Sequence, residues 1–167
     1  MTRQYQYVGP AEIAARVSGR QGGVVVTEKL RDSLRSIDGY QSGENLIVTF
    51  VVTLNGKLLI ADRRSEHVIC AMGQPVLSAG EMTFAFSKER VIVERVTNQS
   101  TGYCPEPESW GAVATALDQL SIERPNGFDP AFCFRRCSSC SQTNIVKDKW
   151  FECDVCQTAL PQRWNFG

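Results

Sequence analysis

Four cysteines near the C-terminal end have the types and spacing of a metal site. The segments "CSSC" and "CDVC" are two C-x-x-C pairs with 12 residues between them. Each pair can curl so that both thiolates reach one ion, and an intervening hairpin would bring the pairs together. Tetrahedral zinc, at about 2.3 Å from sulfur, suits such a site. We therefore predict one structural Zn²⁺ bound by Cys137, Cys140, Cys153 and Cys156.

Other cysteine chemistry fits this pattern less well. Two disulfides would need an oxidising compartment, which nothing in the sequence indicates. A redox-active C-x-x-C would explain one pair but not two at this spacing. Iron stays open, although Ser141 and Gln157 occupy the positions where rubredoxin-like sites commonly have glycine. Because thiolates fill all four positions and leave none for water, the zinc would be structural rather than catalytic.

The segment from about residue 132 to 160 resembles the zinc-ribbon family. From residue 133 onward, five Lys or Arg residues face three Asp or Glu residues, and zinc with four thiolates carries −2, so this part is nearly neutral. Ribbons that bind nucleic acid usually carry more positive charge, because phosphate neutralisation supplies much of the affinity. Trp150 and Phe151 could stack on bases, but we expect them to close the ribbon's small core. We predict a protein-interaction module, with nucleic-acid binding as the second interpretation.

His67, the only histidine, marks a second place for chemistry. Histidine is the usual proton carrier near neutral pH. Gly73 and Gly80 flank it at turns that permit close approach of backbone or ligand, and Glu81 opens the next expected strand. A histidine that merely hydrogen-bonds to backbone is the alternative interpretation.

The segment "NQSTGYC" places amide, hydroxyl, phenol and thiol groups before an expected helix, whose free N–H groups favour anions. A helix N-terminus also lowers a thiol pKa, which would suit a Cys104–His67 nucleophilic pair, whereas a small buried cysteine is the simpler explanation. The alternative to an interaction module is therefore a small enzyme or ligand-binding domain of transferase or hydrolase type. Its catalytic candidates are His67, Glu81 and Tyr103, and its ligand-binding candidates are Asn98, Ser100, Thr101 and Cys104.

The elements that position these residues indicate an α+β fold, with an antiparallel β-meander packed against helices and a docked C-terminal zinc ribbon. The stretch "LIVTFVVTL" is apolar on both faces, which predicts a central strand. Asn55-Gly56 then predicts a hairpin, and "EMTFAF" with "RVIVERV" predicts another. Helices are expected in "GPAEIAARV", in "TEKLRDSLRSI" with Thr27 as N-cap, and in "PEPESWGAVATALDQL".

We expect three parts: an N-terminal helical segment (1–42), an antiparallel α+β domain (43–131) and the zinc ribbon (132–167). The formal net charge of zero argues against a general polyanion binder. The longest apolar run, 46–54, is too short to span a bilayer, and the start "MTRQYQYVGP" lacks the apolar core of a secretory signal. We therefore expect a cytoplasmic protein without membrane contact.

The order of strands, His67, "PVLSAGE", "STGYCP" and a helix resembles the central domain of plant IQM-type calmodulin-binding proteins. It also resembles a related domain of bacterial toxin-like proteins. The resemblance covers about residues 46–120. That family typically has a Ser-Gly-His-Tyr stretch; Ser100 and Tyr103 match its serine and tyrosine, and glycine replaces its histidine. No IQ motif is present, so calmodulin binding is not implied for this chain.

Overall fold

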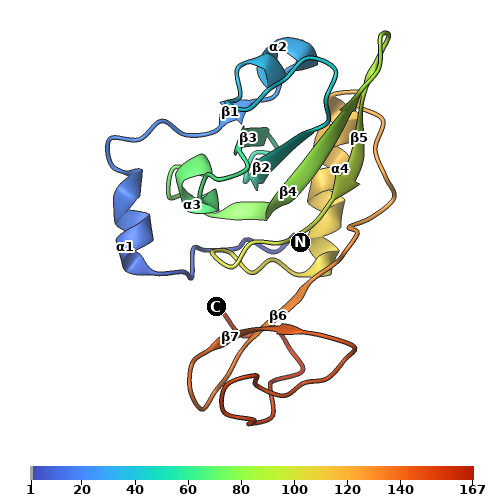
Figure 1. Cartoon of the computed structure of the whole chain (residues 1–167). Coiled ribbons are helices and arrows are strands. Elements are labelled where there is room, and N and C mark those ends of the chain that lie inside the picture. Colours follow the sequence, from blue (N-terminus) through green and yellow to red (C-terminus); the bar gives the residue numbers. More distant parts are fainter. Residues whose placement is uncertain (1) are drawn as a thin grey trace.

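The computed structural model describes residues 2–167 and confirms the α+β class (Figure 1). Its main sheet is antiparallel, with five strands in the order β1-β3-β2-β4-β5. A separate two-stranded sheet, β6-β7, lies below the main sheet in Figure 1. The strands are β1 (Val24–Val25), β2 (Leu46–Thr53), β3 (Leu58–Asp62), β4 (Val76–Phe86), β5 (Val91–Val96), β6 (Cys133–Arg136) and β7 (Thr143–Val146).

Short helices cover both faces of the main sheet. One face packs against α2 and α4, and the other packs against α1, α3 and the N-terminal segment. The α2 helix begins at Leu30 with Lys29 as N-cap and no side-chain cap, so the predicted cap at Thr27 is wrong. The helices are α1 (Ala11–Ala14), the 3₁₀ turn η1 (Ala15–Val17), α2 (Leu30–Arg35), α3 (His67–Cys70), the 3₁₀ turn η2 (Pro107–Ser109) and α4 (Trp110–Gln119).

The β2 strand is central, as its apolar pattern predicts. It lies between β3 and β4, and Val48, Phe50 and Val52 are fully buried on the α4 side. Val51 is fully buried on the opposite side, in the cluster that α3 closes. The predicted hairpin to β3 is present, and Gly56 has the left-handed φ of +78° that glycine adopts without strain.

The C-terminal module, defined as residues 132–167, is joined by a largely buried ion pair to the loop between β5 and η2. Arg135 Nη1 lies 2.7 Å from Glu106 Oε1, and the two side chains are 6% and 13% exposed. Arg135 also donates to the carbonyls of Phe134 and Gln162, at 2.6 and 3.0 Å. The charge count from the sequence treats Arg135 as an ordinary cation of the ribbon, but Arg135 is buried and links β6 to the loop before η2.

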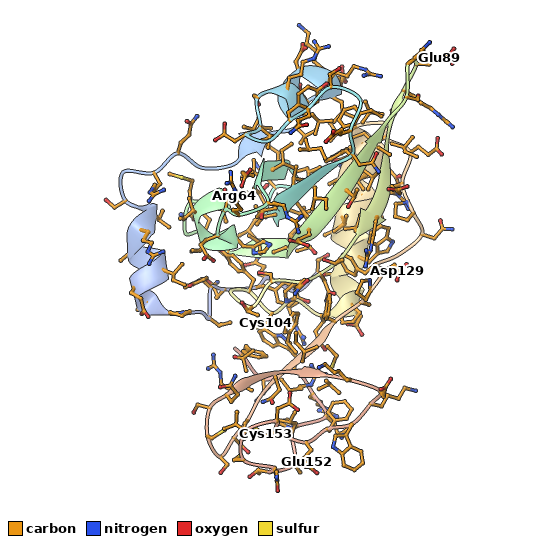
Figure 2. All side chains as sticks on the ribbon, in the orientation of Figure 1. Arg64, Glu89, Cys104, Asp129, Glu152 and Cys153 are labelled. Atoms are coloured by element: carbon orange, nitrogen blue, oxygen red, sulfur yellow. The ribbon has the colours of Figure 1, made fainter. Side chains whose placement is uncertain are left out.

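Trp164 makes the second link. Its indole N–H donates to the carbonyl of Cys104 at 2.8 Å, and its ring packs edge-on against Tyr5. The Tyr5 hydroxyl in turn accepts from the backbone N–H of Glu106 at 3.1 Å. The N-terminal segment, the start of the α4 region and the C-terminal module therefore meet at one point, near the Cys104 label in Figure 2.

Replacing Glu106 with Gln should leave the Arg135 charge buried without its counter-ion. We expect a loss of about 3 kcal/mol in the free energy of unfolding of the metal-loaded protein, typical of a broken buried pair. Urea denaturation measures this loss, and the exposed Glu108→Gln is the matched control, expected within about 0.5 kcal/mol of the original. The double variant Glu106→Leu/Arg135→Met should recover most of the loss. A Glu106→Gln variant as stable as the control would contradict the link.

Candidate metal centre and polar cavity

The four cysteines of the two C-x-x-C pairs lie together in the C-terminal module. All four sulfur atoms lie within 4.8 Å of one another. Cys137 Sγ lies 3.5 Å from Cys156 Sγ, and Cys140 Sγ lies 3.6 Å from Cys153 Sγ. A regular tetrahedron of sulfurs at 2.3 Å from zinc has edges of about 3.8 Å, whereas bonded sulfurs lie about 2.05 Å apart. The four thiols are free, and their arrangement is compatible with a tetrahedral metal site.

The two C-x-x-C segments have the same backbone structure. In each, the N–H of the first cysteine donates to the carbonyl five residues later, at 2.8 and 2.9 Å. The carbonyl of that cysteine accepts from the residue after the second cysteine, at 3.0 and 2.9 Å. Ser141 and Gln157, at that last position, have φ of +64° and +62°. Both segments thus take the left-handed turn that glycine makes most easily, and each offers two sulfurs to one ion.

Asn144 ties the two segments together and was not anticipated from the sequence. Its side chain is buried; Nδ2 donates to the carbonyl of Gln142 at 2.9 Å and contacts Cys153 Sγ at 3.5 Å. Its Oδ1 accepts from the N–H of Asp154 at 2.9 Å. Partners of this kind orient metal ligands and raise metal affinity. The only sequence signal was a polar amide on a short strand beside a cysteine pair.

Local hydrogen bonding also favours the thiolate form of Cys156. The Thr158 hydroxyl lies 3.3 Å from Cys156 Sγ. Together with the Thr158 backbone N–H, it lowers the pKa of Cys156 to about 6. A deprotonated sulfur is the form that binds a metal ion.

Little apolar packing surrounds the cysteines. The buried residues of this cluster are Cys137, Cys153 and Leu160, with Val146 and Phe151 packed against them. Phe151 therefore closes the small core as expected. Trp150 does not, because 69% of its surface is exposed.

Substitution of one clustered cysteine should remove the metal ion and destabilise the C-terminal module. We expect the chain purified under reducing conditions to carry one zinc ion, and Cys140→Ser to lose it and to destabilise the C-terminal module. Cys133→Ser is the matched control, because Cys133 lies on β6 outside the cluster and should keep the metal. Asn144→Leu should retain zinc with an affinity about 10- to 100-fold lower.

Metal analysis by mass spectrometry, with competition against a chelator for affinity, measures all of these variants. The absence of zinc from the unsubstituted protein would contradict the prediction. So would a Cys140→Ser variant that binds zinc as tightly as Cys133→Ser.

A polar cavity of about 290 Å³ lies beside α3 and gathers four of the predicted site residues. This polar cavity is lined by His67, Glu81, Ser100 and Thr101, together with Arg63, Gln99 and further residues of the β3–α3 turn. His67 Nε2 donates to the carbonyl of Gly80 at 2.9 Å, so Nδ1 of the neutral ring is an acceptor. Burial lowers the pKa of His67, which keeps the ring neutral at pH 7.

The walls of the polar cavity are fixed by the sheet. The Thr49 hydroxyl lies 3.3 and 3.1 Å from the carbonyls of Arg63 and Ser65, and holds the turn before α3. Gly80 is required opposite, because a Cβ there would lie 1.9 Å from the carbonyl oxygen of Thr97. Arg63 approaches Glu81 at 4.0 Å across the opening.

The other three predicted residues lie elsewhere and make structural contacts. The Tyr103 hydroxyl donates to the carbonyl of Gln74 at 2.8 Å, and burial raises the pKa of Tyr103. Asn98 is buried and donates to the carbonyls of Pro105 and Phe132, both at 2.8 Å. Burial raises the pKa of Cys104 to about 12, so its sulfur is a thiol at neutral pH.

Comparison with protein-family models, curated proteins and solved structures finds no match. The predicted resemblance to IQM-type and toxin-associated domains therefore gains no support from these comparisons. Within residues 2–167, none of the helices has the length and apolar character needed to cross a membrane.

Proposed function

We propose that this chain is a protein-interaction module that acts inside the cell and whose C-terminal module is a zinc ribbon. The observation that carries the proposal is the exposure of apolar side chains. Among the described residues, the two most exposed large hydrophobic side chains are Trp150 and Val155, at 69% and 64%, and both lie on the C-terminal module. Tryptophan is enriched among the residues that dominate protein–protein binding.

Trp150 is held in a defined place. Its backbone N–H donates to the carbonyl of Lys147 at 2.8 Å and closes a tight turn. Asp148 and Lys149, at the centre of that turn, have φ of +50° and +58°, the pattern of a type I′ turn. Because this turn already fixes the backbone that carries Trp150, binding would have to order only the side chain, which favours affinity.

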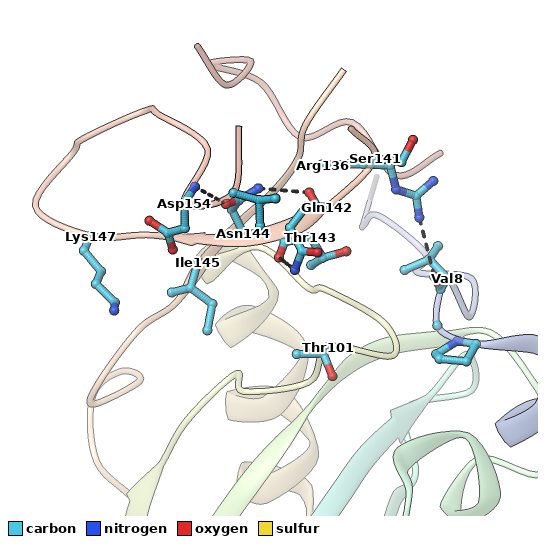
Figure 3. A pocket seen from close by; sticks show the side chains of 13 residues that line it. Val8, Thr101, Arg136, Ser141, Gln142, Thr143, Asn144, Ile145, Lys147 and Asp154 are labelled. Atoms are coloured by element: carbon cyan, nitrogen blue, oxygen red, sulfur yellow. Dashed lines mark hydrogen bonds between the residues drawn. The ribbon is translucent and has the colours of Figure 1, made fainter. Parts of the chain in front are cut away.

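A cleft that Val155 lines is a second feature of the C-terminal module that suits a contact surface. This cleft has a volume of about 660 Å³ and lies between the C-terminal module and the segment around Val8 and Pro10 (Figure 3). Ile145 contributes apolar surface, while Arg136 and Lys147 contribute positive charge and Asp154 negative charge. The near-neutral charge of the module favours a protein over a nucleic acid as the partner.

A photo-crosslinking amino acid placed at Trp150 tests this proposal in cells of the source organism. We expect it to capture a protein that the same group at Leu54 does not capture, because Leu54 is 43% exposed on a hairpin of the main sheet. The captured protein, once purified, should bind the original chain at least about tenfold more tightly than Trp150→Ala, as for an interface tryptophan. Capture of nucleic acid alone, or equal binding by Trp150→Ala, would contradict the proposal.

The second candidate function is ligand binding or transferase- or hydrolase-type catalysis at the polar cavity. The observation that favours it is that His67, Glu81, Ser100 and Thr101 line one cavity. The neutral His67 ring offers Nδ1 as an acceptor, and Glu81 is a carboxylate close by. Acid–base chemistry requires a proton carrier within reach of a bound molecule.

Nuclear magnetic resonance with a set of small polar fragments tests this second function. We expect at least one fragment to shift the amide signals of Glu81, Ser100 and Thr101 and the ring nitrogens of His67. His67→Ala should abolish those shifts and leave the signals of the cysteine cluster unchanged. If no fragment perturbs these residues, the second candidate fails.

A further inference from the structure

The polar cavity continues into a second cavity of about 270 Å³ on the same face of the main sheet. The two share Arg63, Glu81 and Gln99, so they form one groove. Its floor is set by strand register: Thr49 pairs with Glu81, and Ile47 pairs with Thr83, which pairs in turn with Arg95. Two successive rows of side chains across the sheet therefore line the groove.

No helix between residues 2 and 167 covers this part of the sheet face. Val51, two residues further along β2, is fully buried in the cluster that α1 and α3 close. Ile47 and Thr83 are only half-buried, and Arg95 is exposed. The part of the sheet face that helices cover thus ends at α3. The part beyond α3 presents polar and charged groups to solvent.

The arginines of the groove have unused hydrogen-bond donors. Arg95 donates through Nε to the carbonyl of Asp129 at 2.6 Å, which fixes the guanidinium and leaves both Nη atoms without a partner among residues 2–167. Among the residues that the structure describes, the guanidinium of Arg63 has a single charged neighbour within 4.0 Å, the Glu81 carboxylate. Arg64 lines the polar cavity but is already paired with Asp62 at 2.8 Å. A guanidinium with free paired N–H groups is suited to phosphate oxygens.

The far end of the groove is apolar and includes an aromatic ring. Phe132 and Pro130 line it together with Ile47. Asn98 holds Phe132 by its backbone, accepting from its N–H at 2.7 Å and donating to its carbonyl at 2.8 Å. A fixed phenylalanine can stack on a nucleobase, a contact worth about 1–3 kcal/mol.

We propose that this groove binds a free mononucleotide, with the phosphate at Arg63 and Arg95 and the base against Phe132. Glu81 and the hydroxyl of Thr83 on the floor pair with polar groups of the base or the sugar. A free nucleotide is favoured over a nucleic-acid strand because the chain has a net charge of zero, which gives little attraction for a polyanion. The proposal rests on the second candidate function, ligand binding at the polar cavity, and names its ligand.

Titration of the metal-loaded full chain with AMP, GMP, CMP and UMP tests the proposal. We expect at least one of them to shift the amide signals of Arg63, Glu81 and Arg95 at a concentration of about 5 mM or below. The matching nucleoside and inorganic phosphate should each bind at least about tenfold more weakly, because each lacks one of the two contacts.

Two substitutions separate the contacts. Arg95→Ala should weaken nucleotide binding about tenfold, the effect of losing one charge-assisted hydrogen bond. Phe132→Leu should weaken the nucleotide but not inorganic phosphate. Arg90→Ala is the control, because Arg90 lies on the β4–β5 loop, paired with Glu123 at 2.6 Å, and should not change binding.

Three results would overturn the proposal. The first is that no mononucleotide shifts the amide signals of the groove. The second is that inorganic phosphate binds as tightly as the nucleotide. The third is that a single-stranded oligonucleotide binds at least about tenfold more tightly than the mononucleotide. Fragments without phosphate that bind at His67 while no nucleotide does would overturn the ligand class and leave the second candidate function standing. If neither a nucleotide nor a fragment binds anywhere in the groove, both the ligand class and the second candidate function fail.

Discussion

The four clustered sulfurs of the C-terminal module are the feature on which the rest of the account depends, and we propose that a cation binds among them. Charged thiolates within 4.8 Å of one another repel, and the surrounding core is small. Left-handed backbone at Ser141, Gln157, Asp148 and Lys149 adds a further cost of folding. A structural zinc ion supplies roughly 10–16 kcal/mol in small zinc modules, which offsets these terms. The ion would thereby fix both cysteine turns and the hairpin that carries Trp150.

The loop between β5 and η2 joins the module to the main sheet. Asn98 binds Phe132 just before β6, the carbonyl of Cys104 accepts from the Trp164 indole N–H, and Glu106 pairs with Arg135. The mixture of amide, thiol, tyrosine and proline in this loop therefore serves a junction of three segments. Ser100 and Thr101 alone of its predicted site residues reach the polar cavity. The same loop thus positions Phe132 for the groove on one side and the C-terminal module on the other.

Local patterns in the sequence predict a large part of this structure. Cysteine spacing predicts the metal cluster, because two C-x-x-C turns and a hairpin leave few other arrangements for the sulfurs. The apolar character of both faces of β2 predicts its central position, since only a strand covered on both sides needs it. His67 and Glu81 come together because the Gly80 backbone lies next to both.

Features set by distant contacts could not be predicted. Arg135 has the sequence environment of a surface cation, and its burial is compensated by Glu106 and by the carbonyls of Phe134 and Gln162. Tyr103 turns away from the polar cavity because Gln74 offers a carbonyl and Tyr7 packs against its ring. The exposure of Trp150 follows from a type I′ turn without glycine, for which Asp148 and Lys149 give no strong signal.

X-ray absorption at the zinc edge tests the central claim, that one zinc ion holds the C-terminal module, most directly. The purified chain should give a single shell of four sulfur neighbours at about 2.3 Å, with no nitrogen or oxygen neighbour. A shell that contains nitrogen or oxygen, or protein that is fully folded with no zinc signal, would contradict it.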